Sequence, residues 1–172
     1  KLGLYGEAVA VEGVAVASGA ATLVSVDANH DGFLDIVVSS ESGSQLLTNA
    51  DGVLSAGPKF ARVTAWADFQ RRGRFDALTK EAFLVNDKGQ SFLDADALVA
   101  HAFATPGDFN TDGRTDVISV DGDGKVHFHE NRIESENHGI SVHLEGVKSP
   151  KLARGARVEV KAGLRYEKQI YN

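Results

Sequence analysis

The 172-residue sequence contains no cysteine and no methionine, and it has only three prolines and one tryptophan. The absence of cysteine excludes disulfide bonds, thiolate metal sites and a cysteine nucleophile, but it does not identify the cellular compartment. No apolar run approaches the roughly 18 residues that a membrane-spanning helix needs, so we expect no membrane span. The chain starts at Lys1 without an initiator methionine, and we expect a mature chain or a piece of a longer polypeptide.

Clustered positive charge is also scarce. The formal net charge is −6, which disfavours nucleic acid as a partner because attraction to phosphate needs grouped Lys and Arg. Residues 138–172 are the exception, with 7 basic and 3 acidic side chains. Their charged residues alternate with apolar ones, and we interpret them as the solvent-facing side of a β-strand.

One oxygen-rich motif occurs twice with little change. Residues 27–35 (loop 1) read Asp-Ala-Asn-His-Asp-Gly-Phe-Leu-Asp, and residues 108–116 (loop 3) read Asp-Phe-Asn-Thr-Asp-Gly-Arg-Thr-Asp. Oxygen-bearing side chains fall on alternate positions, and Gly32 or Gly113 allows the backbone to wrap around a common point. Calcium prefers six to eight oxygen ligands, so this pattern predicts two Ca²⁺ sites.

The spacing also predicts the ligands of each site. In loop 1 they are the side chains of Asp27, Asn29, Asp31 and Asp35 with the carbonyl of Phe33; in loop 3 they are the side chains of Asp108, Asn110, Asp112 and Asp116 with the carbonyl of Arg114. An EF-hand opens in the same way, but it needs a bidentate Glu at position twelve and flanking helices. Position twelve is Val38 or Ser119, and the flanking sequences read as strands, so we exclude an EF-hand.

A third copy of the motif, residues 68–76 (loop 2), keeps the frame but changes the chemistry. Asp68 and Asp76 remain at its ends, whereas Gln70 and Arg72 occupy the third and fifth positions. A cation would meet a guanidinium there, so we predict no metal in loop 2. We expect Arg72 to pair with Asp68 or Asp76 instead.

The three loops begin 41 and 40 residues apart, and each is followed by short strand-like runs separated by turn signals such as 49–52 and 86–89. A period of about 40 residues with four short strands is typical of propeller blades. The sequence therefore predicts an all-β fold: a partial β-propeller of about three four-stranded blades over residues 1–131. Strands are expected over 7–18 as well.

The pattern changes after residue 131. Apolar residues alternate over 140–144 and again over 156–162, which predicts a small C-terminal antiparallel β module within 138–172.

These motifs resemble the FG-GAP/VCBS repeats of integrin-α-like β-propellers, whose blades carry an Asp-x-Asx-x-Asp-Gly-x-x-Asp loop between their first two strands. The tail, with Asn137-His138, Leu144-Glu145-Gly146 and Gly155-Ala156-Arg157-Val158, is similar to the start of an ASPIC/UnbV domain. Such propellers usually have about seven blades, so the resemblance implies that the ring does not close with this chain alone.

The resemblance implies a non-enzymatic role as a binding, adhesion or scaffold subunit that is secreted, periplasmic or on the cell surface, with a protein or carbohydrate partner. Two alternatives stay open: the propeller portion of a secreted carbohydrate-active enzyme (a lyase or hydrolase), and a structural subunit of a larger envelope or electron-transfer assembly. We find no catalytic motif, because no nucleophile elbow and no phosphate-binding glycine loop followed by a helix is present.

Overall fold

The regular secondary structure of the described residues consists of β-strands. A computed structural model describes residues 9–14, 19, 21–95, 103–137, 140, 142–147, 156–162 and 165–170. Within those residues there are thirteen strands and no helix. The all-β prediction is therefore confirmed, and no described helix could cross a membrane.

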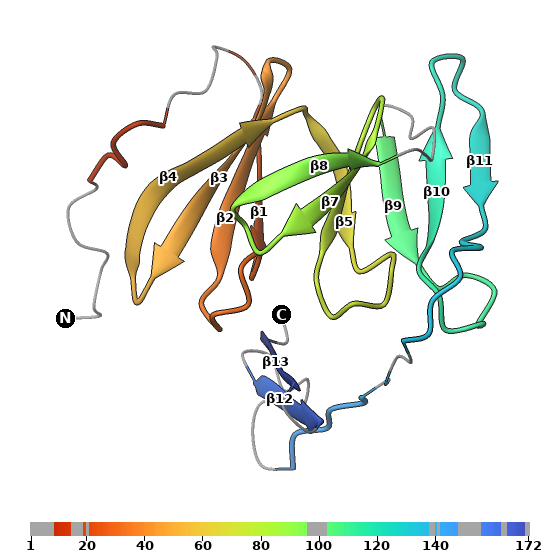
Figure 1. Ribbon diagram of the computed structural model, residues 1–172. Coiled ribbons are helices and arrows are strands. Elements are labelled where there is room, and N and C mark those ends of the chain that lie inside the picture. The colour runs from red at the N-terminus through yellow and green to blue at the C-terminus, as the bar shows by residue number, and fades with distance from the viewer. Residues whose placement is uncertain are drawn as a thin grey trace.

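Three antiparallel sheets follow one another along the chain, and a two-stranded hairpin comes after them (Figure 1). The first sheet has the order β1 (Thr22–Val26), β2 (Asp35–Ser40), β3 (Gly43–Ala50), β4 (Val53–Phe60); the second has β5 (Val63–Ala67), β6 (Asp76–Thr79), β7 (Phe83–Asp87), β8 (Ser91–Ala95); the third has β11 (Val126–His129), β10 (Asp116–Val120), β9 (Phe103–Gly107); the hairpin pairs β12 (Arg157–Ala162) with β13 (Arg165–Ile170).

Tight turns join neighbouring strands, as their sequences predict. Asp51 and Gly52 between β3 and β4 have φ of 50° and 88°, and Lys88 and Gly89 between β7 and β8 have φ of 51° and 71°. Positive φ at both residues matches the right-handed twist of the two-residue hairpin between β3 and β4, whereas three residues, 88–90, join β7 and β8. An asparagine starts each turn, and its side-chain oxygen accepts the N–H of the glycine at 2.8 Å.

Equivalent positions in the three sheets form cross-strand pairs: the residue ten positions after the first aspartate of each loop pairs with an apolar residue of the next strand. Val37 pairs with Leu46 in the first sheet, Leu78 with Phe83 in the second, and Ile118 with Phe128 in the third. We call the side that carries these pairs the forward face, since in the first two sheets it packs against the sheet that follows. The forward pairs of the first two sheets are buried, whereas Phe128 is 54% exposed.

The core lies between the sheets. Val26, Val37 and Leu46 of the first sheet form one cluster with Trp66 and Phe92 of the second. Ala65, Leu78 and Phe83 of the second sheet form another with Val117 of the third. Each sheet is thus covered by its neighbour, and the loops at the ends of the strands are brought close together.

Three expectations about strands differ from the structure. The third sheet has three strands within the described residues, where a fourth was expected. The alternating residues 140 and 142–147 are not in a strand, and neither are residues 9–14, the described part of the strands expected over 7–18. A strand needs a partner for its backbone groups, and alternation alone does not supply one. The hairpin β12–β13 agrees with the expected antiparallel tail, although residues 138–139, 141, 148–155, 163–164 and 171–172 lie outside the described part.

Candidate metal centre

The three loops connect the first two strands of their sheets, and their backbones wrap in the same way. The glycine at position six has a φ of 87° in Gly32, 76° in Gly73 and 77° in Gly113. This left-handed conformation favours glycine because a Cβ would be strained there. Its N–H donates to the first aspartate of the loop, at 2.9, 2.7 and 2.9 Å respectively. The shared frame predicted from sequence is therefore present.

Position four was not singled out from the sequence, although it is also strained. His30, Arg71 and Thr111 have positive φ values of 62°, 54° and 61°. Non-glycine residues in this region are uncommon. Nothing in the types of these three residues signals the conformation; only their common place in the repeat does.

In loop 1 the expected side-chain ligands receive backbone N–H groups. The Oδ1 of Asn29 accepts from Asp31 at 3.0 Å, and the Oδ1 of Asp31 accepts from Phe33 at 2.8 Å. The last residue, Asp35, accepts from Ala28 at 2.9 Å and from Asn49 at 2.8 Å. These bonds fold the oxygen-bearing side chains back over the loop.

Within loop 1, Asp27 has one oxygen without a donor, and in loop 2 the Oδ2 of Asp76 likewise has none among the described residues. The residue is 6% exposed, and its buried Oδ1 has no hydrogen-bond partner among the described residues. Burial is the largest cause that raises the pKa of Asp27, and burial likewise raises the pKa of Asp35. Backbone hydrogen bonds and the nearby His30 oppose the rise in the pKa of Asp27 without cancelling it, so a cation bound at loop 1 would further stabilise this buried carboxylate.

Loop 3 repeats the bonds of loop 1 in a more open setting. Asn110 and Asp112 accept from Asp112 and Arg114 at 3.0 and 2.8 Å, and Asp116 accepts from Phe109 and Asn131 at 3.2 and 2.8 Å. Asp108, Asn110 and Asp112 are exposed, whereas Asp116 is fully buried. The two loops therefore offer the same oxygen atoms at different depths.

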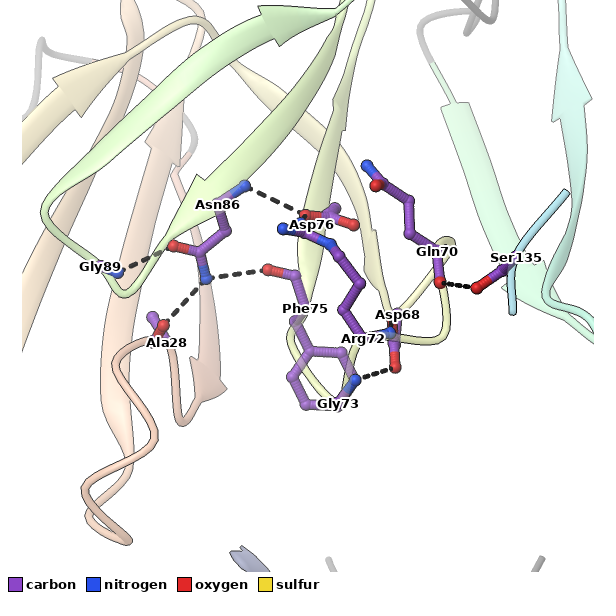
Figure 2. Close-up of polar contacts among 10 residues, drawn as sticks. All are labelled: Ala28, Asp68, Gln70, Arg72, Gly73, Phe75, Asp76, Asn86, Gly89 and Ser135. Carbon is purple, nitrogen blue, oxygen red and sulfur yellow. Dashed lines mark hydrogen bonds and ion pairs between the residues drawn. The ribbon is translucent and has the colours of Figure 1, made fainter. Parts of the chain in front are cut away.

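Loop 2 contains its own cation. The Nη2 of Arg72 lies 2.6 Å from the Oδ1 of Asp76, so the expected pairing of Arg72 with Asp76 is confirmed (Figure 2). Asp68 instead accepts the backbone N–H groups of Arg72 and Gly73, at 2.8 and 2.7 Å. Burial raises the pKa of Asp76, and the hydrogen bond from Asn86 and the charge of Arg72 oppose that rise.

Gln70, the remaining residue singled out in loop 2, makes its contact through the backbone. Its carbonyl accepts a hydrogen bond from the Ser135 hydroxyl at 3.1 Å, as Figure 2 shows. Loop 2 is thereby tied to the segment that follows the third sheet.

The carboxylates do not converge on one point. Within the described residues, no group of three or more His, Cys, Asp or Glu side chains has the arrangement that would hold a metal ion. The donor chemistry of loops 1 and 3 fits calcium, since all expected ligands are oxygens. Binding would require these side chains to turn from the loop N–H groups toward a shared ion.

Sequence reasoning missed the role of three asparagines that follow the loops. Asn49, Asn86 and Asn131 each donate a backbone N–H to the last aspartate of their own repeat, at 2.8, 3.0 and 2.8 Å. Their spacing from that aspartate varies, being 14, 10 and 15 residues. The irregular spacing hides the equivalence from a motif search.

No protein-family model, curated protein or solved structure matches this chain. The resemblance to FG-GAP/VCBS repeats and to the ASPIC/UnbV domain therefore stays a prediction that rests on the motifs themselves.

Proposed function

We propose that this chain is a calcium-stabilised repeat scaffold, a partial β-propeller that binds a partner and performs no chemistry. The observation that carries the proposal is the buried Asp27 carboxylate, whose Oδ1 lacks a donor among the described residues. Calcium would neutralise this charge and draw the other loop oxygens toward it. The ion's contribution is structural, because it joins the two ends of the loop between the first strands of a sheet.

The contrast between loops supports two ions rather than three. In loop 2 the guanidinium of Arg72 occupies the fifth position of the motif and pairs with the buried Asp76. In loops 1 and 3 the fifth position is Asp31 or Asp112. A protein-borne cation thus compensates Asp76, and loops with a carboxylate at that position need a cation from solution.

Calcium-binding loops of this kind favour a protein that works outside the cytoplasm. Extracellular calcium modules bind with Kd values of about 10⁻⁴ to 10⁻³ M, and such sites load where calcium is abundant. We propose a secreted, periplasmic or cell-surface location, and a protein or carbohydrate partner. The loop ends of the sheets offer the contact surface, because loops held on a rigid sheet scaffold commonly carry binding.

The test is a comparison of melting temperatures with and without millimolar calcium. We expect calcium to raise the melting temperature of the parent, since a ligand that binds only the folded state stabilises it. The double variant Asp31→Ala/Asp112→Ala should lose this response. Glu41→Ala, which removes an exposed carboxylate outside the loops, is the matched control and should keep it.

Two outcomes would contradict the proposal. If calcium stabilised the parent and the double variant equally, the ions would bind elsewhere. If the purified protein cleaved a polysaccharide, the binding role would give way to the carbohydrate-active enzyme.

A further inference from the structure

Arg71 reaches from loop 2 to loop 3. Its Nη2 donates to the backbone carbonyl of Asp112 at 3.4 Å, across 41 residues of sequence. The same nitrogen lies 3.5 Å from the place where a Cβ on Gly113 would stand. The guanidinium therefore rests against the part of loop 3 that carries the fifth and sixth motif positions.

We propose that Arg71 sets the calcium affinity of loop 3 below that of loop 1, so that the two loops load in sequence as calcium rises. This inference rests on the proposed function and adds the way in which its two sites are regulated. Arg71 is not a ligand. It acts through its charge on the site that Asp112 helps to form.

The sign of the effect follows from electrostatics. The guanidinium of Arg71 presents a positive charge to loop 3. A divalent cation bound by Asp108 and Asp112 would be repelled by it. Arg71 is half-buried, which reduces the screening of this repulsion by water.

Loop 1 has a different environment. Two neutral groups of the second sheet lie against it: the Asn86 amide donates to the Ala28 carbonyl at 2.8 Å, and a Cβ on Gly89 would lie 3.3 Å from the Cβ of Asn29. Loop 1 is also more deeply buried, with Asp27 6% exposed. Loops 1 and 3 thus have the same donor atoms but different electrostatic surroundings and different burial.

The second arginine of loop 2 that could repel calcium is already compensated. Arg72 pairs with Asp76 at 2.6 Å, so its charge is balanced within its own loop. Arg71, in contrast, donates to a neutral carbonyl, which balances no charge. Of these two, Arg71 is therefore the one whose field acts on loop 3.

The experiment is a calcium titration of the ¹⁵N-labelled protein followed by NMR. The amides of Gly32 and Gly113, at position six of loops 1 and 3, report each site separately. In the parent, the Gly32 resonance should shift at a lower calcium concentration than the Gly113 resonance. In Arg71→Gln, the midpoint for Gly113 should fall by about three- to tenfold while that for Gly32 stays unchanged.

Two control variants separate charge from shape. Arg71→Lys keeps the charge at the same left-handed backbone position and should titrate like the parent. Arg74→Gln removes an equal charge from loop 2 without touching the Arg71 contact, and it should also leave the midpoint for Gly113 nearly unchanged. Raising the salt concentration should reduce the difference between parent and Arg71→Gln.

A midpoint for Gly113 that is unchanged or higher in Arg71→Gln would overturn the inference while leaving the two calcium sites intact. An equal fall in Arg74→Gln would also overturn it, because net charge alone would then explain the effect. If neither glycine resonance moved in the parent at millimolar calcium, the proposed function itself would fail. The three failures are therefore distinguishable.

Discussion

The side-chain amide of Asn86 joins two sheets by donating to the carbonyl of Ala28 at 2.8 Å. The same nitrogen donates to Phe75 within its own repeat at 2.9 Å, and the side-chain oxygen accepts from Gly89 (Figure 2). Asn131 does the same one repeat later, donating to Phe69 at 2.9 Å. In both cases an asparagine holds the second residue of the loop one repeat earlier, so loops 1 and 2 are each fixed by the repeat that follows them.

Replacing Asn86 with alanine should therefore lower the free energy of unfolding more than replacing an asparagine that bonds only within its own turn and repeat. The carbonyls of Ala28 and Phe75 would lose their donor in a buried site, which should lower the free energy of unfolding by about 2–4 kcal/mol. Asn49→Ala is the control, because Asn49 is half-buried and makes the equivalent bond within its own repeat to Leu34. We expect a loss of about 1 kcal/mol there. Equal losses in urea denaturation would contradict the role of Asn86 between sheets.

Much of the fold follows from local sequence, and the contacts between repeats do not. The Asp and Gly spacing of loops 1 to 3 predicts their shared frame, because a tight wrap with positive φ at position six is a local requirement. The bond from Asn86 to Ala28 spans 58 residues and depends on how two sheets pack. The alternation over 140–144 predicts a strand that is not formed in the described residues, because pairing depends on a partner.

The expected calcium ligands are likewise a prediction from chemistry alone. The spacing identifies the oxygen atoms, and the structure adds what spacing does not contain, namely which carboxylates are buried. Asp27 and Asp35 are buried, whereas Asp108 is exposed at the same motif position as Asp27. That difference arises because the second sheet covers loop 1.

Removing the cation of loop 2 should make stability depend on pH. Arg72→Met leaves the charge of buried Asp76 uncompensated, so we expect a loss of about 2 kcal/mol at neutral pH. The pKa of Asp76 is already raised by burial from its ordinary 3.8, and without Arg72 it should rise further. As the pH falls toward that raised pKa, the folded state takes up a proton before the unfolded state does, so the loss should shrink.

Urea denaturation of parent and Arg72→Met at pH 7 and at about pH 5 measures this effect. Arg74→Met serves as the control for loss of an arginine from the same loop. A loss of stability that stayed constant or grew toward acidic pH would show that Asp76 is not the group that Arg72 compensates.

The forward faces give a prediction about packing. Phe83 and Phe128 occupy equivalent positions, but Phe83 is 7% exposed beneath the third sheet, and Phe128 is 54% exposed. Phe83→Ala should lower the free energy of unfolding by about 3–5 kcal/mol. Phe128→Ala should change it by about 1 kcal/mol or less, since exposed substitutions have small effects. Similar losses would mean that the forward face of the third sheet is covered in solution.

Loop 2 should bind calcium when its third and fifth positions carry the oxygen side chains found in loop 1. The double variant Gln70→Asn/Arg72→Asp gives residues 68–76 the oxygen side chains of loop 1 at positions one, three, five and nine, on a backbone whose Gly73 already has a φ of 76°. The buried Asp76 would then lose its guanidinium partner and need a cation from solution. We expect isothermal titration to count three calcium ions in place of two.

The double variant should also respond to calcium more strongly than the parent. Without calcium it should melt at a lower temperature, because Asp76 is uncompensated, and millimolar calcium should restore the loss. Gln70→Asn alone keeps Arg72 and is the matched control, with two ions expected. A double variant that still bound two ions would show that Arg72 is not what excludes calcium from loop 2. The geometry of the loop, rather than the charge at its fifth position, would then determine occupancy.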